Sequence, residues 1–294
     1  MYGEARGSGR GYSLWVFEVY GTLTLTAPPP AAAFPVKRGA SGRFLAGQNN
    51  KPFLVTADSL QSIAANLSEA QADTYFANRK ALDFNAASIN VFAFYSFYPS
   101  PSRSDGATCD GIIRPLTGHV ASGTDGIHYD VRRKAYWAML CGGAGQFYGN
   151  AHIRTFKTGW NNNLNKPGAA LISCLKRFFS SLAWHNLVPD QTHALVTAGY
   201  GSPGNGSTRV SQSDNCAASM TPDGTRGAAY MPAARTITVN MSKLSKAVTA
   251  SWLDPADKTA AAIPGSPFVN RGTGQFTPPA KNSAKDSDWV LVLR

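Results

Sequence analysis

The chain has 294 residues, of which 43% are hydrophobic and only 15% are charged, together with 28 Gly and 18 Pro. This composition allows one large domain or two ordinary ones, and it favours a loop-rich, β-containing extracellular protein over a helical cytosolic one. The formal net charge is +11. Because Lys and Arg are scattered and no aromatic-basic array is present, the charge indicates a solvated basic surface and no nucleic-acid partner.

Cysteine usage argues against a metal centre. The four cysteines, Cys109, Cys141, Cys174 and Cys216, form no CxxC pair and have no histidine at ligand spacing, whereas zinc sites need such spacing. No phosphate loop or Ser-His-Asp spacing stands out, so the sequence predicts no metal and no cofactor. Cys141 and Cys174 lie in apolar helical surroundings and are predicted to be buried thiols. Whether any two of the four cysteines form a disulfide is left open by the sequence.

The N-terminus resembles a secretory signal. Basic residues precede an apolar run at 12–26, and three alanines at 31–33 offer a cleavage site for a signal peptidase, although Glu18 interrupts the run. We therefore expect residues 1–35 to be a leader, either a signal peptide or a disordered segment, and the protein to be secreted or periplasmic. No stretch reaches the roughly 18 apolar residues of a membrane span.

The first half of the chain alternates strands and helices. Its first predicted elements are a hairpin, a helical segment, a capped helix and a buried strand, over residues 42–56, 60–66, 68–82 and 85–95. Ser68 and Gln71 have the spacing of a capping box, which marks the start of the helix. Strand, helix and strand in this order indicate a parallel βαβ unit.

Residues 96–128 break this pattern, because they are rich in Ser, Pro, Gly, Asp and Thr. A loop of this length argues against a normal fold in that region. Order returns with a helix at 131–140, for which Asp130 is the predicted cap. A strand at 146–149 and a helix at 167–183 with Pro in its first turn follow.

From residue 187 onward the pattern becomes all-β. Short alternating runs separated by Gly, Pro, Asn and Asp predict strands at 193–198, 226–231, 236–240, 248–253 and 289–293. Regular short strands with such turns indicate a β-sandwich. We therefore place a domain boundary near residue 187.

Ordered segments in both halves resemble the apiosidase-like glycoside hydrolases. In the first half these segments are Gly42-Arg43-Phe44-Leu45, Asn66 to Arg79, Phe84-Asn85-Ala86, Val131 to Trp137 and Gly145 to Gly149. The tail resembles the family's C-terminal module, which is labelled a collagen-binding domain of a collagenase, through Arg235 to Val239, Trp252 to Pro255, Gly265 to Phe268, Phe276 to Pro279 and Asp288 to Leu293. The resemblance covers most of residues 40–100 and 122–294.

The resemblance implies a shortened catalytic domain. Members of this family fold as (β/α)₈ barrels, which need about 250 residues, but Arg43 to Asn186 spans only 144. The resemblance breaks near Gly118 and resumes near Ser122, as if the third to seventh βα units were absent. Strands one, two and eight, which are neighbours in a closed barrel, would remain.

The expected fold class is therefore α/β plus all-β, a partial (β/α) barrel remnant of strands one, two and eight followed by an antiparallel β-sandwich. We expect a leader, a truncated apiosidase-like barrel and a β-sandwich over residues 1–35, 36–186 and 187–294. An open remnant would expose sheet edges, which favour self-association.

The same resemblance bears on catalysis. Glycosidases generally use two carboxylates, which in barrels lie at the carboxyl ends of strands. In this family the expected pair is an Asp after the fourth strand and a Glu near the seventh, both within the missing stretch. No Glu occurs after Glu69, so the resemblance implies an impaired glycoside hydrolase.

Four residues are candidates for binding substrate. Asp58 resembles a pocket-lining position at the end of the family's first strand, or it caps a helix that starts at Ser59. Tyr148 and His152 follow the last strand, and Trp160 lies in the next loop, where it could stack on a sugar ring. The alternatives are core positions for Tyr148 and Trp160 and a surface or structural role for His152.

Three interpretations of the whole chain stay open. The first is a glycoside hydrolase by descent that is inactive and belongs to plant or bacterial polysaccharide breakdown. The second is a non-catalytic protein that binds a glycan or matrix through the β-sandwich. Its aromatic candidates there are Tyr230 and Trp252, for which we favour core positions. The third is a gene-model artefact without a stable protein.

Overall fold

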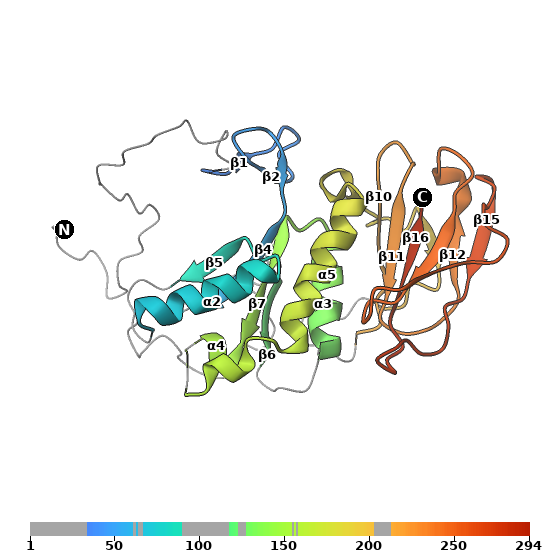
Figure 1. Cartoon of the computed structure of the whole chain (residues 1–294). Coiled ribbons are helices and arrows are strands. Elements are labelled where there is room, and N and C mark those ends of the chain that lie inside the picture. The colour runs from blue at the N-terminus through green and yellow to red at the C-terminus, as the bar shows by residue number, and fades with distance from the viewer. Residues whose placement is uncertain are drawn as a thin grey trace.

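A computed structural model of the chain describes residues 34–60, 63, 67–89, 118–122, 128–154, 156, 158–202 and 213–294. Figure 1 shows a parallel sheet with helices beside a set of antiparallel sheets that contains the C-terminal end of the chain. The predicted leader lies outside the described residues except for its last two positions. Within the described part of the chain, no helix is long and apolar enough to cross a membrane.

A small antiparallel hairpin precedes the parallel sheet, as the polar turn at 48–50 predicted. Strand β2 (Leu45–Ala46) pairs with β3 (Pro52–Phe53), and β1 (Lys37–Arg38) pairs with the other edge of β2. Asn50 in the turn has a φ of 61°, a left-handed conformation for which Asn is enriched.

Four parallel strands form the sheet of the first half. Strand β4 (Val55–Leu60) pairs with β5 (Ala86–Ile89) and β7 (Gly145–Asn150), and β7 pairs with β6 (Gly118–Ser122). The strand order is β5-β4-β7-β6, so the three strands predicted to be neighbours lie side by side. The fourth strand, β6, corrects the prediction of an unbroken loop over 96–128.

Helix α2 (Glu69–Ala81) begins at the predicted capping box. The Ser68 hydroxyl accepts a hydrogen bond from the Gln71 N–H, and the Gln71 side chain accepts one from the Ser68 N–H. The preceding segment, expected to be helical over 60–66, lies largely outside the described residues, and Leu60 itself ends strand β4.

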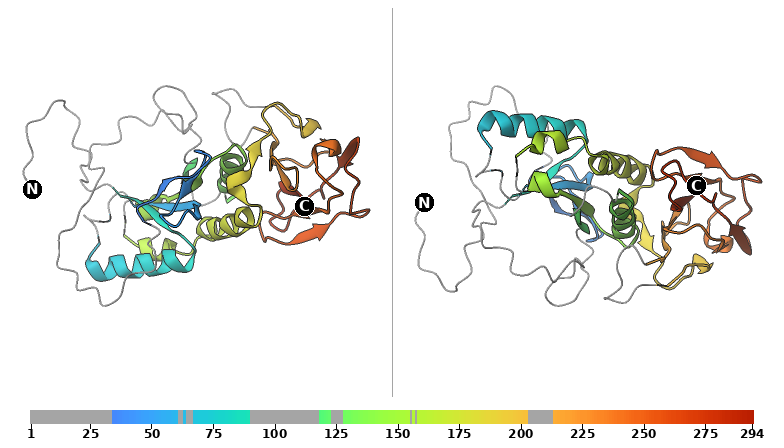
Figure 2. Two further views of the ribbon diagram at one scale, coloured as in Figure 1. Left: turned by 90° about the horizontal axis from the view of Figure 1, so that it is seen from above. Right: turned by 90° about the horizontal axis from the view of Figure 1, so that it is seen from below.

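Two further helices of similar length follow, and they run side by side (Figures 1 and 2). Helix α3 (His128–Leu140) starts earlier than predicted, so Asp130 lies in its first turn and is not the cap. A carboxylate in this position is still stabilised by the positive end of the helix dipole. Helix α5 (Pro167–Ser181) starts with Pro as predicted. Short helices α4, η1 and η2 span Ala151–Arg154, Trp160–Asn163 and Trp184–Asn186.

The C-terminal part consists of two antiparallel sheets, here called the C-terminal sheets. The six-stranded sheet has the order β14-β13-β16-β11-β10-β8, and the three-stranded sheet has the order β15-β12-β9. The strands are β8 (Val188–Pro189), β9 (Val196–Ala198), β10 (Ala217–Met220), β11 (Gly227–Met231), β12 (Ile237–Asn240), β13 (Ala250–Leu253), β14 (Ala260–Ala262), β15 (Thr273–Phe276) and β16 (Trp289–Leu293). The five predicted strands are present, and β8, β10, β14 and β15 are additions.

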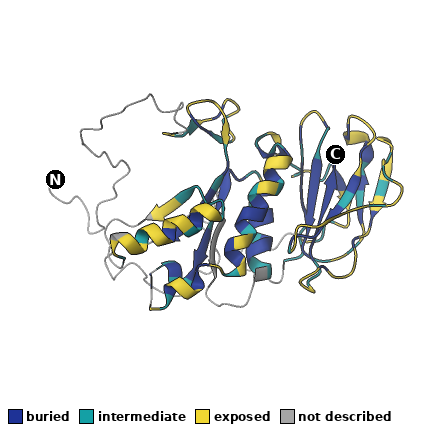
Figure 3. Ribbon diagram, viewed as in Figure 1, coloured by how far each residue is buried: buried dark blue, intermediate teal, exposed yellow. Residues whose placement is uncertain are grey.

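The central strands of the six-stranded sheet are buried on both faces. On one face, Ala229, Leu291 and Leu293 join residues of the three-stranded sheet in one hydrophobic cluster. On the other face, Tyr230 and Val292 join side chains of α3 and α5 in a second cluster. Figure 3 shows β11 and β16 buried along their length. The two halves of the molecule therefore share one continuous core.

Aromatic stacking marks the centre of this shared core. The rings of Tyr136 in α3 and Tyr230 in β11 are stacked, with centroids 4.9 Å apart and an interplanar angle of 8°. Phe179 of α5 packs against Tyr136 at 5.8 Å. Tyr230 is fully buried and Trp252 is 6% exposed, so both lie in the core, as favoured from the sequence.

The cysteines divide into exposed and buried thiols. Cys174 and Cys216 are buried and Cys141 is exposed, and all three are free. The prediction of a buried thiol is wrong for Cys141 because it follows the last residue of α3, where the helix leaves the core. Burial raises the pKa of Cys216 to about 12. Cys109 lies outside the described residues.

Gly145 at the start of β7 should not tolerate a side chain. Its φ is +153°, and a Cβ would lie 2.1 Å from the Val55 carbonyl oxygen on the adjacent strand. We expect Gly145→Ala to lower the free energy of unfolding by about 1–3 kcal/mol in a denaturant titration. The control is Gly227→Ala, where the nearest atoms are 3.6 Å away, and an equal loss in both variants would contradict the argument.

Candidate functional site

Asp58 lies in β4 with its carboxylate buried beneath α2. One carboxylate oxygen, Oδ1, accepts the Ser59 N–H at 2.7 Å, and the other, Oδ2, accepts the Tyr75 hydroxyl at 2.5 Å and Arg79 Nε at 2.6 Å. Asp58, Tyr75 and Arg79 are 1%, 0% and 3% exposed. Asp58 does not cap a helix that starts at Ser59, because β4 continues through Leu60.

The charges in this cluster compensate one another. Burial raises the pKa of Asp58, and Arg79 together with the hydrogen bonds from Tyr75 and Ser59 opposes that rise. Burial and the nearby carboxylate raise the pKa of Tyr75, so its hydroxyl stays protonated and donates. All three groups around Asp58 are donors, which is the environment of an ionised carboxylate. The hydrogen bonds and ion pair of this cluster connect α2 to strand β4 of the parallel sheet.

The partners of Asp58 were not identified from the sequence, although a usable pattern was present. Tyr75 and Arg79 are four residues apart, so they share one face of α2. An arginine on the same face as a buried tyrosine indicates a buried acid opposite. Arg79 also donates from Nη1 to the Leu164 carbonyl at 2.8 Å, which adds the segment after η1 to the cluster.

The two aromatic candidates are core residues in this structure. Tyr148 is 3% exposed and packs with Ile172 of α5 and Phe84. A Cβ on Gly168 would lie 2.9 Å from the Tyr148 ring, so the close approach of α5 requires glycine there. Trp160 is 9% exposed and packs edge-to-face against Phe156 at 5.5 Å. Neither ring presents an open face for stacking.

His152 occupies a different environment at the carboxyl end of β7. The Asn150 side chain accepts the His152 N–H at 2.8 Å and so begins helix α4. The His152 ring is half-buried, and within the described part of the chain its Nδ1 is buried without a hydrogen-bond partner. Among the four candidates, His152 is therefore the one with a buried polar atom that lacks a partner in that part of the chain.

The structure brings three of the four candidates to one side of the parallel sheet. Asp58 and Tyr148 are register partners on adjacent strands, and Tyr75 connects Asp58 to Trp160 through a ring contact at 6.3 Å. All three are buried under helices, so they do not line an open cavity in this structure. In the described residues no group of three His, Cys, Asp or Glu could hold a metal ion.

A second buried polar network connects α3 to the C-terminal sheets. Arg132 donates to Asp288 from Nε at 3.1 Å and from Nη2 at 2.9 Å, and Nη2 also donates to Asp286. Asp288 accepts further hydrogen bonds from the Tyr230 hydroxyl at 3.1 Å and Asn282 Nδ2 at 2.6 Å. This network was not predicted from the sequence.

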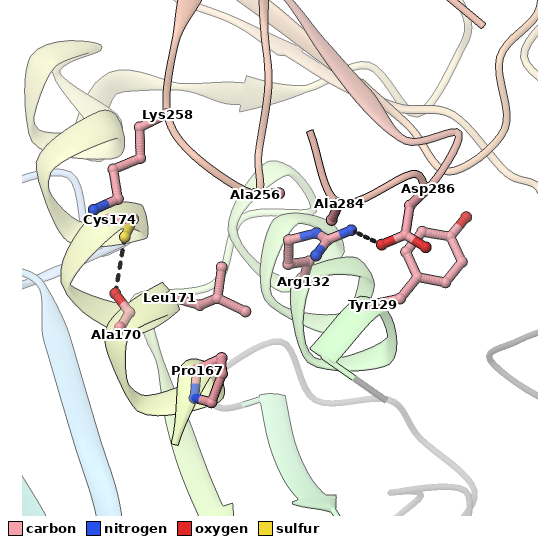
Figure 4. A pocket seen from close by; sticks show the side chains of 10 residues that line it. All are labelled: Tyr129, Arg132, Pro167, Ala170, Leu171, Cys174, Ala256, Lys258, Ala284 and Asp286. Carbon is pink, nitrogen blue, oxygen red and sulfur yellow. Dashed lines mark hydrogen bonds and ion pairs between the residues drawn. The ribbon is translucent and has the colours of Figure 1, made fainter. Parts of the chain in front are cut away.

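A cavity of about 430 Å³ lies beside this network, between the first turns of α3 and α5 and two loops of the C-terminal sheets (Figure 4). We call it the interface cavity. It is lined by Tyr129, Arg132, Pro167, Ala170, Leu171, Cys174, Ala256, Lys258, Ala284 and Asp286. None of the four sequence candidates contributes to this lining.

Two family models match the chain. Residues 121–186 match the model described as "Apiosidase-like, catalytic domain", and residues 206–294 match the "Putative collagen-binding domain of a collagenase". The resemblance seen in the sequence is confirmed for these two segments. Residues 40–100, which also carry that resemblance, lie outside both matches.

Solved structures of glycoside hydrolases share the fold. One described as a glycoside hydrolase has a TM-score of 0.63 at 15% identity, covering 88% of this chain and 96% of its own. A glycoside hydrolase family 5 structure from Bacteroides vulgatus ATCC 8482 has a TM-score of 0.63 at 14% identity, covering 88% and 93%. At these identities the likeness establishes the fold alone. No curated protein matches the chain.

Proposed function

We propose that the chain is a glycoside hydrolase-related protein of plant or bacterial polysaccharide breakdown that binds glycan but no longer hydrolyses it. The observation that carries the proposal is the state of Asp58. It is the one carboxylate on the four described parallel strands, and it is engaged by Arg79 at 2.6 Å. Hydrolysis needs two carboxylates flanking the scissile bond, and this sheet offers neither a pair nor a free one.

Strand order supports descent from a closed barrel. Strand β4 pairs in parallel with both β5 and β7, as the first strand of a barrel pairs with the second and the last. We therefore include in the proposal a truncated barrel over residues 36–186 and a β-sandwich over 187–294, preceded by a leader that directs secretion or export to the periplasm. The outer edges of β5 and β6 would be sites of self-association.

The alternative function is glycan or matrix binding through the C-terminal sheets alone. A specific observation favours it, because β12 and β15 present a row of uncharged polar side chains on their outer face. Thr238 lies opposite Gln275, Asn240 lies opposite Thr273, and the Thr236 and Thr277 hydroxyls are 2.8 Å apart. Hydroxyl and amide groups of this kind can exchange hydrogen bonds with sugar hydroxyls.

The test compares turnover with retention on the same substrates. The full chain is incubated with plant and bacterial polysaccharides, and new reducing ends are counted against a heat-denatured control. The same polymers are cast into native gels to measure retardation of the protein. We expect retardation on at least one polymer and no reducing ends above the control.

Each other outcome has a clear meaning. Reducing ends above the control would show a working catalytic pair and overturn the proposed impairment. Retardation that Gln275→Ala abolishes and His152→Ala leaves intact would favour the alternative through the C-terminal sheets. Neither turnover nor retardation on any polymer would contradict a glycan function of either kind.

A further inference from the structure

The interface cavity has the size and position of a small-molecule site. Ligand pockets generally measure about 300–1,000 Å³ and often lie between structural units, and this one measures about 430 Å³. Its α5 wall is formed by apolar residues that include Pro167, Leu171 and Cys174, and Arg132 and Asp286 lie on the opposite side (Figure 4). Such a division suits a ligand with one apolar face and one polar edge.

The charges that line the cavity are unequally satisfied. Arg132 is neutralised by Asp286 and Asp288. Lys258 is exposed, and in the described part of the chain its ammonium group makes no ion pair or hydrogen bond. Figure 4 shows the Lys258 side chain directed toward α5 near Cys174, on the other side of the cavity from Arg132 and Asp286. A cation without a counter-ion at a cavity wall attracts an anion.

Two more polar groups are available at the opposite wall. Arg132 uses Nε and Nη2 for its ion pairs, and no bond from its Nη1 is formed within the described residues. Asp286 engages Arg132 through Oδ2 only, and its side chain is 32% exposed. The cavity thus offers one unpaired cation for a carboxylate and, on the opposite side, one donor and one acceptor for hydroxyls.

We propose that the interface cavity binds a small hydroxylated carboxylate. Lys258 faces its carboxylate, Arg132 Nη1 donates to a hydroxyl at the other end of the ligand, and Asp286 accepts from a hydroxyl there. Pro167 and Leu171 cover its apolar face. The ligand is one sugar ring, or an open chain of that length, in size. This site is separate from the parallel sheet and does not depend on whether the protein retains polysaccharide.

The test is isothermal titration calorimetry on the full chain at low salt with D-glucuronate, D-gluconate and D-glucose. We expect an acid to bind and glucose not to bind, and the preference between glucuronate and gluconate distinguishes a ring from an open chain. Lys258→Gln should weaken binding at least about tenfold, because a charge-assisted hydrogen bond is lost.

Lys285→Gln is the matched control. Lys285 is an exposed lysine in a left-handed conformation, with a φ of 63° against 74° for Lys258, and it does not line the cavity. Thermal melts establish that both variants fold. Equal weakening by both substitutions would mean attraction to overall charge and would overturn the proposal, as would binding of glucose equal to that of the acids or no binding of either acid.

Discussion

Asp58→Asn should lower the free energy of unfolding by about 3–5 kcal/mol, because it leaves the Arg79 charge buried without its counter-ion. Arg79 is 3% exposed, so water cannot replace the lost carboxylate. The amide also presents a donor where Tyr75, Ser59 and Arg79 all donate. A chemical denaturation curve measures the loss, which corresponds to a fall in Tm of roughly 10 °C.

Asp83→Asn provides the matched control for this substitution. Asp83 pairs with Arg177 at 3.6 Å, but their side chains are 43% and 70% exposed, and exposed pairs contribute at most about 1 kcal/mol. Asn also tolerates the left-handed φ of 63° at this position. If Asp58→Asn kept full stability but lost glycan retention, Asp58 would be a ligand-binding residue as the family resemblance implies.

The local sequence patterns predicted helices and hairpins well. The capping box at Ser68 and the proline at the start of α5 mark helix starts that the structure confirms. These signals work because they concern contacts within a few residues of the chain. Strand β6 escaped because five residues with Gly, His, Ala and Ser have no strong strand pattern, and pairing with β7 alone identifies it as a strand.

Burial of the candidate residues was harder to predict, because it depends on distant partners. Asp58 and Trp160 are polar or amphipathic residues near strand ends, where exposed ligand contacts are common. The structure instead buries Asp58 beneath α2 and packs Trp160, the first residue of η1, against Tyr75 and Phe156. The spacing of Tyr75 and Arg79 places both on one face of α2, but no local pattern shows that this face lies against Asp58.

The strongest missed signal concerns the C-terminal sheets. Residues 289–293 read Trp-Val-Leu-Val-Leu and are buried throughout. We predicted this segment as one of the short alternating strands of a β-sandwich, but a continuous apolar strand indicates a sheet covered on both faces. The second cover is α3 and α5, which belong to the preceding region of the chain. The boundary at residue 187 therefore crosses a hydrophobic core.

The largest effect should follow from cutting the chain at that boundary. A fragment of residues 187–294 would expose Tyr230, Val290 and Val292, which in the full chain pack against α3 and α5. An apolar sheet face of this kind favours aggregation. We expect the fragment to aggregate and to lack a cooperative melt, whereas residues 34–294 should unfold in one transition and stay soluble. Light scattering and circular dichroism on both measure this.

A pair of substitutions tests the reason for that behaviour. Val292→Thr on the face toward α3 and α5 should improve the solubility of the fragment, because it places a hydroxyl on newly exposed surface. In the full chain the same change buries that hydroxyl and should lower the free energy of unfolding by about 1–3 kcal/mol. Leu291→Thr, on the face between the two C-terminal sheets, should destabilise both forms. The two substitutions have opposite effects in the fragment only if α3 and α5 are an integral cover of the sheet. A soluble fragment with a cooperative melt would instead establish an independent C-terminal domain.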